Sequence, residues 1–120
     1  MDNEPDAKEG KLVSSSTGRN FLLQSIFFQN GYFVIITEGE QRIGAMSVAI
    51  STSNKASVAK IIPSKYDSIF INTIAEKVSS MTNGICLVSL HNKSQLQLDD
   101  MKAIMGEVLN IVGSKKHERR

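Results

Sequence analysis

Asp99-Asp100 is the one adjacent pair of acids in this sequence, and two neighbouring carboxyl groups are able to share acid–base work. The pair also falls in the first turn of a helix predicted from residue 98, where carboxylates stabilise the exposed amides at the positive end of the helix. Glu38 and Glu40 flank Gly39 in a polar connection, and we expect both to be solvated. The acids therefore favour a structural role over a catalytic one.

Cys86 and the two histidines offer little further chemistry. Cys86 stands in the apolar run Ile85–Val88, and apolar surroundings raise the pKa of a thiol, so we expect it to be buried and inert. Neither His91 nor His117 has a second ligand at helical or hairpin spacing, so we expect no metal. The sequence predicts no enzyme and no cofactor; an enzyme built on Cys86 or on the acid pair is the alternative.

The polar cluster Ser64-Lys65-Tyr66-Asp67 has two open interpretations. It joins a short strand to a predicted helix, where its charges and aromatic ring would be available to a partner. Equally, Tyr66 would pack across the start of the helix while the Asp67 carboxylate caps the first amides. Both interpretations stand on the sequence alone.

The Asn30-Gly31 step separates two runs rich in aromatic and β-branched residues, Phe21–Phe28 and Tyr32–Thr37. A tight hairpin of the mirror-image type needs positive φ at both central residues, which Asn and Gly tolerate, so the step predicts such a turn. Neither arm carries His, Cys, Asp or Lys. The strongest predicted element therefore contains no catalytic group.

Further strands are expected at 43–50 and, ended by Pro63, at 58–62; Gly44 and Ala45 in the first indicate a close backbone approach or a bulge. A 3.6-residue apolar period predicts a helix from Ser68 that stops at 82–84, followed by a central strand at 85–90. A capping-box pattern, Ser94 with Gln97, precedes a second helix ending at Gly113. The apolar stripe expected on this helix comprises Leu98, Met101, Met105, Val108 and Val112, with Ile104 and Ile111 beside it.

This order predicts an α+β fold: a largely antiparallel sheet of five to six strands with two helices on one face. We expect a flexible arm at 1–18, in which 11–13 could form an edge strand, a single domain at 19–113 and a basic tail at 114–120. The sequence has 14 basic and 12 acidic residues. Three basic and four acidic residues precede residue 21, and four basic and one acidic residue follow residue 113, so residues 21–113 contain seven of each. A neutral domain predicts no nucleic-acid partner.

No apolar run approaches the roughly 20 residues of a membrane span, and the acidic N-terminus is unlike a signal peptide, so we expect a cytosolic or nuclear protein and no membrane partner.

Apolar side chains occupy both faces of the predicted hairpin, and two helices are able to cover only one face of a sheet. Large exposed apolar patches on soluble proteins generally mark interfaces, so the other face is expected to meet a partner chain. The interface residues predicted on this basis, together with the polar cluster, are Phe27, Tyr32, Val34, Ile36, Lys65, Tyr66 and Asp67.

Several segments carry a resemblance to a known family. They are Phe27–Ile50, Ile74–Val78, Thr82-Asn83, Cys86–Ser89 and Lys93-Ser94. Together they make most of residues 20–113 resemble the small proteasome assembly chaperones 3 and 4, with a slight lean toward chaperone 4. The resemblance implies no enzyme activity and a heterodimer of two paralogues that promotes assembly of the α-ring of the 20S core particle, in contact with its α-subunits. A small scaffold or adaptor subunit of another cytosolic complex is the alternative.

Overall fold

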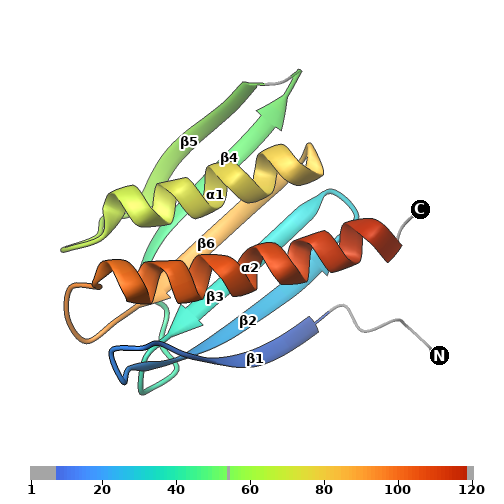
Figure 1. Cartoon of the computed structure of the whole chain (residues 1–120). Helices are drawn as coiled ribbons and strands as arrows, with labels where there is room; N and C mark the ends of the chain where they lie inside the picture. Colours follow the sequence, from blue (N-terminus) through green and yellow to red (C-terminus); the bar gives the residue numbers. More distant parts are fainter. Residues whose placement is uncertain (1–7, 54, 119–120) are drawn as a thin grey trace.

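The computed structural model describes residues 8–53 and 55–118, which form one sheet and two helices (Figure 1). In chain order the elements are β1 (Lys8–Ser14), β2 (Asn20–Phe28), β3 (Gly31–Thr37), β4 (Ala45–Thr52), β5 (Lys55–Ile62), α1 (Ser68–Thr82), β6 (Ile85–His91) and α2 (Leu98–Glu118).

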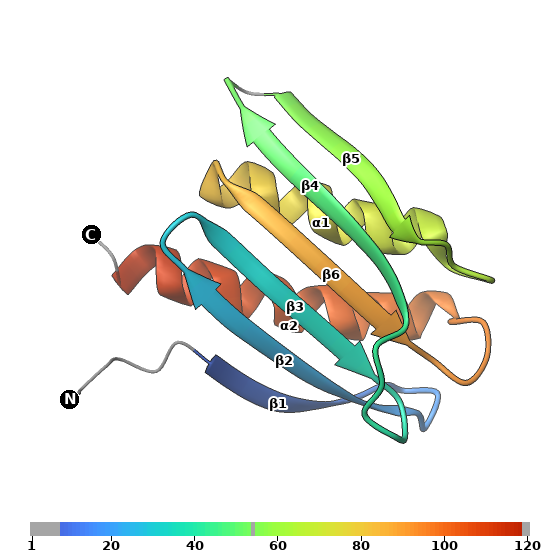
Figure 2. The same ribbon diagram turned by 180° about the vertical axis from the view of Figure 1, so that it is seen from behind.

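The sheet has six strands in the order β1-β2-β3-β6-β4-β5. The β3–β6 pair is parallel, and the other four pairs are antiparallel. Both helices pack on the same face, and the opposite face carries none (Figures 1 and 2). The predicted α+β fold and the central position of the strand after the first helix are confirmed.

Two Asn-Gly steps meet at one end of the sheet, where β3 and β6 begin side by side. The carbonyl of Asn30 accepts a hydrogen bond from the Ile85 amide at 2.8 Å. A Cβ on Gly31 would overlap the Ile85 carbonyl, and one on Gly84 would overlap the Asn30 carbonyl. Glycine is therefore required at both positions by close backbone approach.

The predicted conformation of the hairpin turn is wrong. Phe28 pairs with Gly31, so the turn consists of Gln29 and Asn30, and neither Asn30 nor Gly31 has a positive φ. The physical reason is that Gly31 is already the first residue of β3, where it provides the space that the parallel pair needs. Its lack of a side chain matters here, and its conformational freedom does not.

Close approach also explains the small residues at the start of β4. A Cβ on Gly44 would overlap the carbonyl of Leu90, and the β4–β5 register shifts between Met46 and Ser47. Both features expected from Gly44 and Ala45, a close neighbour and a bulge, are thus present. The strand itself starts at Ala45, and Ile43 before it is exposed.

The caps of α1 differ from those expected. Asp67 occupies the N-cap position, but its carboxylate makes no cap hydrogen bond; it accepts from Asn92 and Leu96 in the loop that leads to α2. At the other end Asn83, and not Gly84, adopts the left-handed conformation, with φ 52° and ψ 47°. Asn tolerates that conformation, and Gly84 is needed beside Asn30 instead.

The second helix also differs from its prediction. Its N-cap pair is Gln97 and Asp100 rather than Ser94 and Gln97, because the Asp100 carboxylate accepts from the Gln97 amide at 2.9 Å. The helix continues through Gly113, whose cost in a helix is only about 1 kcal/mol. Leu98 is exposed, and the buried stripe comprises Ile104, Val108, Ile111 and Val112.

Secondary structure begins earlier and ends later in the sequence than predicted. Of the expected flexible arm at 1–18, residues 1–7 lie outside the described residues, whereas 8–14 form β1 along the edge of β2. Of the expected tail at 114–120, residues 114–118 belong to α2 and the last two lie outside the described residues. Within Lys11-Leu12-Val13 only Val13 is buried, and its side chain joins the hydrophobic core.

We predict that Gly31→Ala destabilises the protein by about 3 kcal/mol, because the added methyl group has to displace the Ile85 backbone. Gly106→Ala is the matched control: nothing lies within 4 Å of its Cβ position, and alanine in a helix is expected to add about 1 kcal/mol of stability. Urea unfolding followed by circular dichroism measures both. Equal effects of the two substitutions would contradict the close approach at the β3–β6 junction.

Candidate protein interface

No helix covers one face of the sheet, and this helix-free face is open to a partner (Figure 2). Side chains alternate along a strand, so the neighbours of the buried residues point to this face. One row across four strands is wholly apolar and half-buried: Ile26, Phe33, Leu87 and Val48. Ile85 and the exposed Ile50 lie in the next row toward the β2–β3 turn, where Phe28 is half exposed.

Three of the predicted interface residues point the other way. Tyr32, Val34 and Ile36 are at most 3% exposed, because they lie beneath the helices in the core. Phe27 points to the same side, and its ring lies 5.3 Å from that of Tyr32. These side chains are occupied within the chain, so a partner docked on the sheet would meet the residues between them, such as Phe33.

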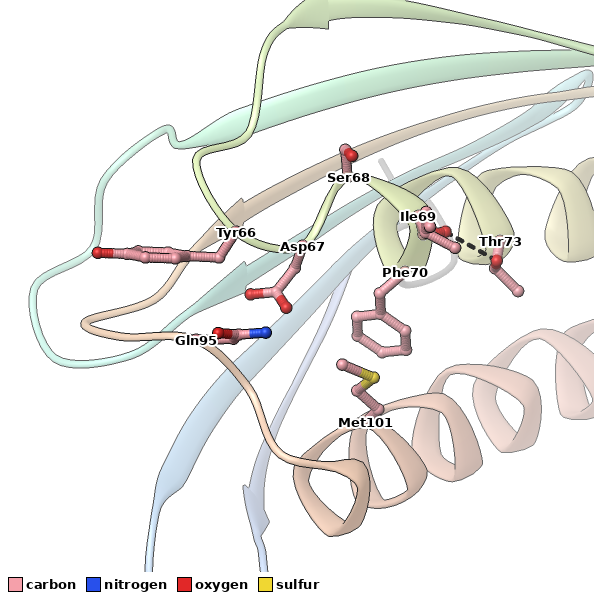
Figure 3. A pocket seen from close by; sticks show the side chains of 8 residues that line it. All are labelled: Tyr66, Asp67, Ser68, Ile69, Phe70, Thr73, Gln95 and Met101. Atoms are coloured by element: carbon pink, nitrogen blue, oxygen red, sulfur yellow. Dashed lines mark hydrogen bonds between the residues drawn. The ribbon is translucent and has the colours of Figure 1, made fainter.

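The polar cluster before α1 is divided between surface and interior. Lys65 is exposed, Tyr66 is about half exposed, and Asp67 is buried. Tyr66 and Asp67 line a pocket of about 410 Å³ that also contains residues of α1 and α2 (Figure 3). Ser64 positions the cluster, since its hydroxyl oxygen accepts hydrogen bonds from the amides of Tyr66 and Asp67.

Arg19 forms a buried polar centre that the sequence did not reveal. Its guanidinium binds both carboxylate oxygens of Glu38, at 2.7 and 2.9 Å, and its remaining N–H groups reach the carbonyls of Ser94 and Gln95 and the carboxylate of Asp100. All five guanidinium donors are therefore used. Glu38 was expected to be solvated, but it is only 8% exposed. Its carboxylate also accepts a hydrogen bond from the Lys93 amide.

Asp100, the second acid of the α2 pair, completes this centre, which we call the Arg19 clasp (Arg19, Glu38 and Asp100). Asp100 is fully buried and accepts from Thr17 at 2.6 Å, and Asp99 accepts from Ser16 at 2.9 Å. The two acids thus hold the β1–β2 turn against the start of α2. Acid–base work by the pair is not favoured by this arrangement, since each carboxylate is engaged separately.

The charges of the clasp lower the pKa values of both buried acids. The hydrogen bond from Arg19 holds the pKa of Glu38 below its ordinary value of 4.5, against the effect of burial. Burial by itself would raise the pKa of Asp100, but hydrogen bonds from Thr17 and the Gln97 amide, with the charge of Arg19, lower it below 3.8. Both groups are therefore ionised at neutral pH.

The remaining candidates for chemistry are isolated from one another. Cys86 is fully buried in β6, and burial raises the pKa of its thiol to about 12, so it stays protonated. Within residues 8–53 and 55–118, no three His, Cys, Asp or Glu side chains are grouped to hold a metal ion. In the same part of the chain, neither helix is long and apolar enough to cross a membrane.

Comparison with known proteins gives a match in structure only. No family model and no curated protein sequence matches this chain. Among solved structures, a chain of a chaperone complex for yeast 20S proteasome assembly superposes with a TM-score of 0.53 over 92% of this chain and 94% of that one, at 12% identity. The similarity shows a common fold, and at this identity it shows nothing more.

We predict that Arg19→Met lowers stability by about 3 kcal/mol, because it leaves two buried carboxylates without their cation. Arg42→Met is the control, since Arg42 pairs with Glu40 at 3.8 Å on the surface and its loss is expected to cost less than about 1 kcal/mol. Urea unfolding at neutral pH compares the two. A similar loss in both variants would contradict a stabilising role for the clasp.

The clasp also predicts how stability depends on pH. Glu38 and Asp100 have lower pKa values when folded, so the stability they add is present above their ordinary values of 4.5 and 3.8 and is lost as the pH falls through the folded values. Unfolding curves between pH 6 and pH 2 are expected to show this loss. It should be smaller in Glu38→Gln, and an unchanged pH profile in that variant would exclude Glu38 as a contributor.

The helix-free face predicts that the full chain alone associates with itself, because the row of Ile26, Phe33, Leu87 and Val48 is apolar and uncovered. Sedimentation velocity is expected to give a sedimentation coefficient that rises with protein concentration. Leu87→Lys should reduce this rise by placing a charge at the centre of the row. A monomer at every concentration would argue against the face as an interface.

Proposed function

We propose that this protein is a non-enzymatic assembly chaperone that pairs with a paralogous chaperone and promotes assembly of the 20S proteasome α-ring. The observation that carries the proposal is the apolar helix-free face, on a fold shared with a chain of a yeast chaperone complex for 20S proteasome assembly. The fold match supports a chaperone class, and the resemblance in the sequence supplies the heterodimer and the α-ring.

The face fits a protein partner better than a small ligand. A sheet face is broad and gently twisted, and a second sheet packs on such a face about 10 Å away with interdigitated side chains. Met46, Val48 and Leu87 lie next to one another on β4 and β6 and offer a half-buried apolar area. The paralogue would present a similar face, so that each chain keeps its helices on the outside of the pair.

An assembly chaperone of this kind needs selective affinity and no catalytic group. It binds one state of an unfinished complex more tightly than the others and thereby raises the population of that state. Later subunits that compete for the same surface displace it. The buried, protonated thiol of Cys86 and the structural roles of Asp99 and Asp100 are consistent with such a function. The proposed site of action is the cytoplasm or the nucleus.

Co-expression with a paralogous proteasome assembly chaperone tests the pairing. We expect a complex with one copy of each chain by native mass spectrometry. Leu87→Lys should lower the yield of this complex about tenfold or more, because it buries an unpaired charge at the interface. Ser80→Lys is the matched control, since Ser80 is exposed on α1, on the helix side of the sheet.

The α-ring role has a separate readout. A pull-down with the tagged pair is expected to recover 20S α-subunits, and washing with high salt should leave the two chaperone chains together because their contact is apolar. A stable pair that recovers subunits of another complex would favour the adaptor alternative. Recovery of neither a paralogue nor α-subunits would overturn the proposal.

A further inference from the structure

The pocket at the start of α1 is a second surface that the sheet face does not explain. Both helices lie on the same side of the sheet (Figure 1). The pocket lies between the first turns of the two helices and the loop that leads into α2 (Figure 3). Its volume of about 410 Å³ is in the range of small-ligand and side-chain sites. Helix–sheet packing does not require such a space, so it is a candidate for binding.

The polar group of this pocket is the carboxylate of Asp67. The residue is 4% exposed, and its Oδ2 accepts hydrogen bonds from the Asn92 side chain at 2.8 Å and from the Leu96 amide at 3.4 Å. No described hydrogen bond reaches Oδ1. Among the described residues, Thr37 Oγ1 is the one fully buried side-chain polar atom without a hydrogen-bond partner. Asp67 Oδ1 has no described partner either, so it is not fully buried, and Asp67 lines the pocket.

The remaining walls are mainly apolar. Phe70 of α1 and Met101 of α2 lie next to each other in the wall of the pocket, and Ile69 stands at its rim with 81% of its surface exposed (Figure 3). The half-exposed ring of Tyr66 forms another side. A ligand that fits has an apolar stem and a positively charged end, because a carboxylate in apolar surroundings attracts cations strongly.

We infer that this pocket binds a basic side chain, preferably arginine, presented by a segment of the protein that the chaperone holds. The aliphatic stem packs against Phe70 and Met101, the guanidinium reaches Asp67 Oδ1, and its planar face stacks on Tyr66. The identity of that protein as a proteasome α-subunit rests on the proposed function. The chemistry of the pocket does not.

The N-terminus of α1 gives the opposite preference but a weaker one. A helix N-terminus carries about half a positive charge and would favour an anion. Asp67 brings a full negative charge to the same place, and the Arg19 guanidinium, which interacts with it electrostatically, is already bound to Glu38 and Asp100. We therefore expect the pocket to favour a cation, and the experiment below separates the two cases.

The butylguanidinium ion is the probe, and butyrate and butanol, each with four carbon atoms in all, are the controls. In the full protein, in the oligomeric state in which it purifies, we expect butylguanidinium to shift the NMR signals of the Met101 methyl group and the Phe70 ring. Its affinity should exceed that of butanol about fivefold. Equal binding of all three probes, or stronger binding of butyrate, would overturn the inference, and so would the absence of any shift.

Ile69→Glu and Ile69→Lys form a matched pair at an exposed helical position, and both residues are good helix formers. A cationic ligand is expected to bind the Glu variant about fivefold more tightly than the Lys variant. Asp67→Asn should remove the preference for butylguanidinium over butanol, and if that variant fails to fold, the Ile69 pair still decides. Because the probe is a small ion, loss of the pairing or of α-subunit recovery tests the proposed function separately.

Discussion

The rest of this structure depends on how closely two parallel strands begin. The Asn30 carbonyl and the Ile85 amide join β3 to β6 at 2.8 Å, and Gly31 and Gly84 leave the space for it. This junction places β6 in the middle of the sheet, between β3 and β4. The two helices that flank β6 in the sequence, α1 and α2, both pack on one face, so the opposite face is left open.

Local patterns predicted the element types well, because they depend on neighbouring residues. The run Phe21–Phe28 and the helical period from Ser68 needed no tertiary information. Predicting which face of each strand lies under the helices did need tertiary information. Tyr32, Val34 and Ile36 could not be distinguished from Phe33 and Ile35, since both sets are apolar. A faint cue existed in β2, where the short Ser25 is buried under the helices and the longer Gln24 is on the open face.

The Arg19 clasp shows why polar sites are harder to predict than apolar ones. Arg19, Glu38 and Asp100 are far apart in the sequence and look like ordinary surface charges, and only the fold brings them together. Contacts within the clasp also lower the pKa values of its two acids. Glu38 and Asp100 remain ionised although they are buried, because the guanidinium and backbone amides donate hydrogen bonds to their carboxylates. The same holds for Asp67, whose cap position was predictable but whose hydrogen bonds to Asn92 and Leu96 were not.

On the proposed function, the two surfaces would have different tasks in a chaperone that releases its client. An apolar sheet face buries much area and is insensitive to salt, which suits a lasting partner. A pocket with one carboxylate contributes little area and depends on charge, so a competing subunit would displace its ligand easily. The pocket lies on the helix side of the sheet and the apolar face lies on the other side, so both can be occupied at once. A chain with the apolar face alone would pair without selecting its client, and on this proposal Asp67 supplies the selectivity that the apolar residues lack.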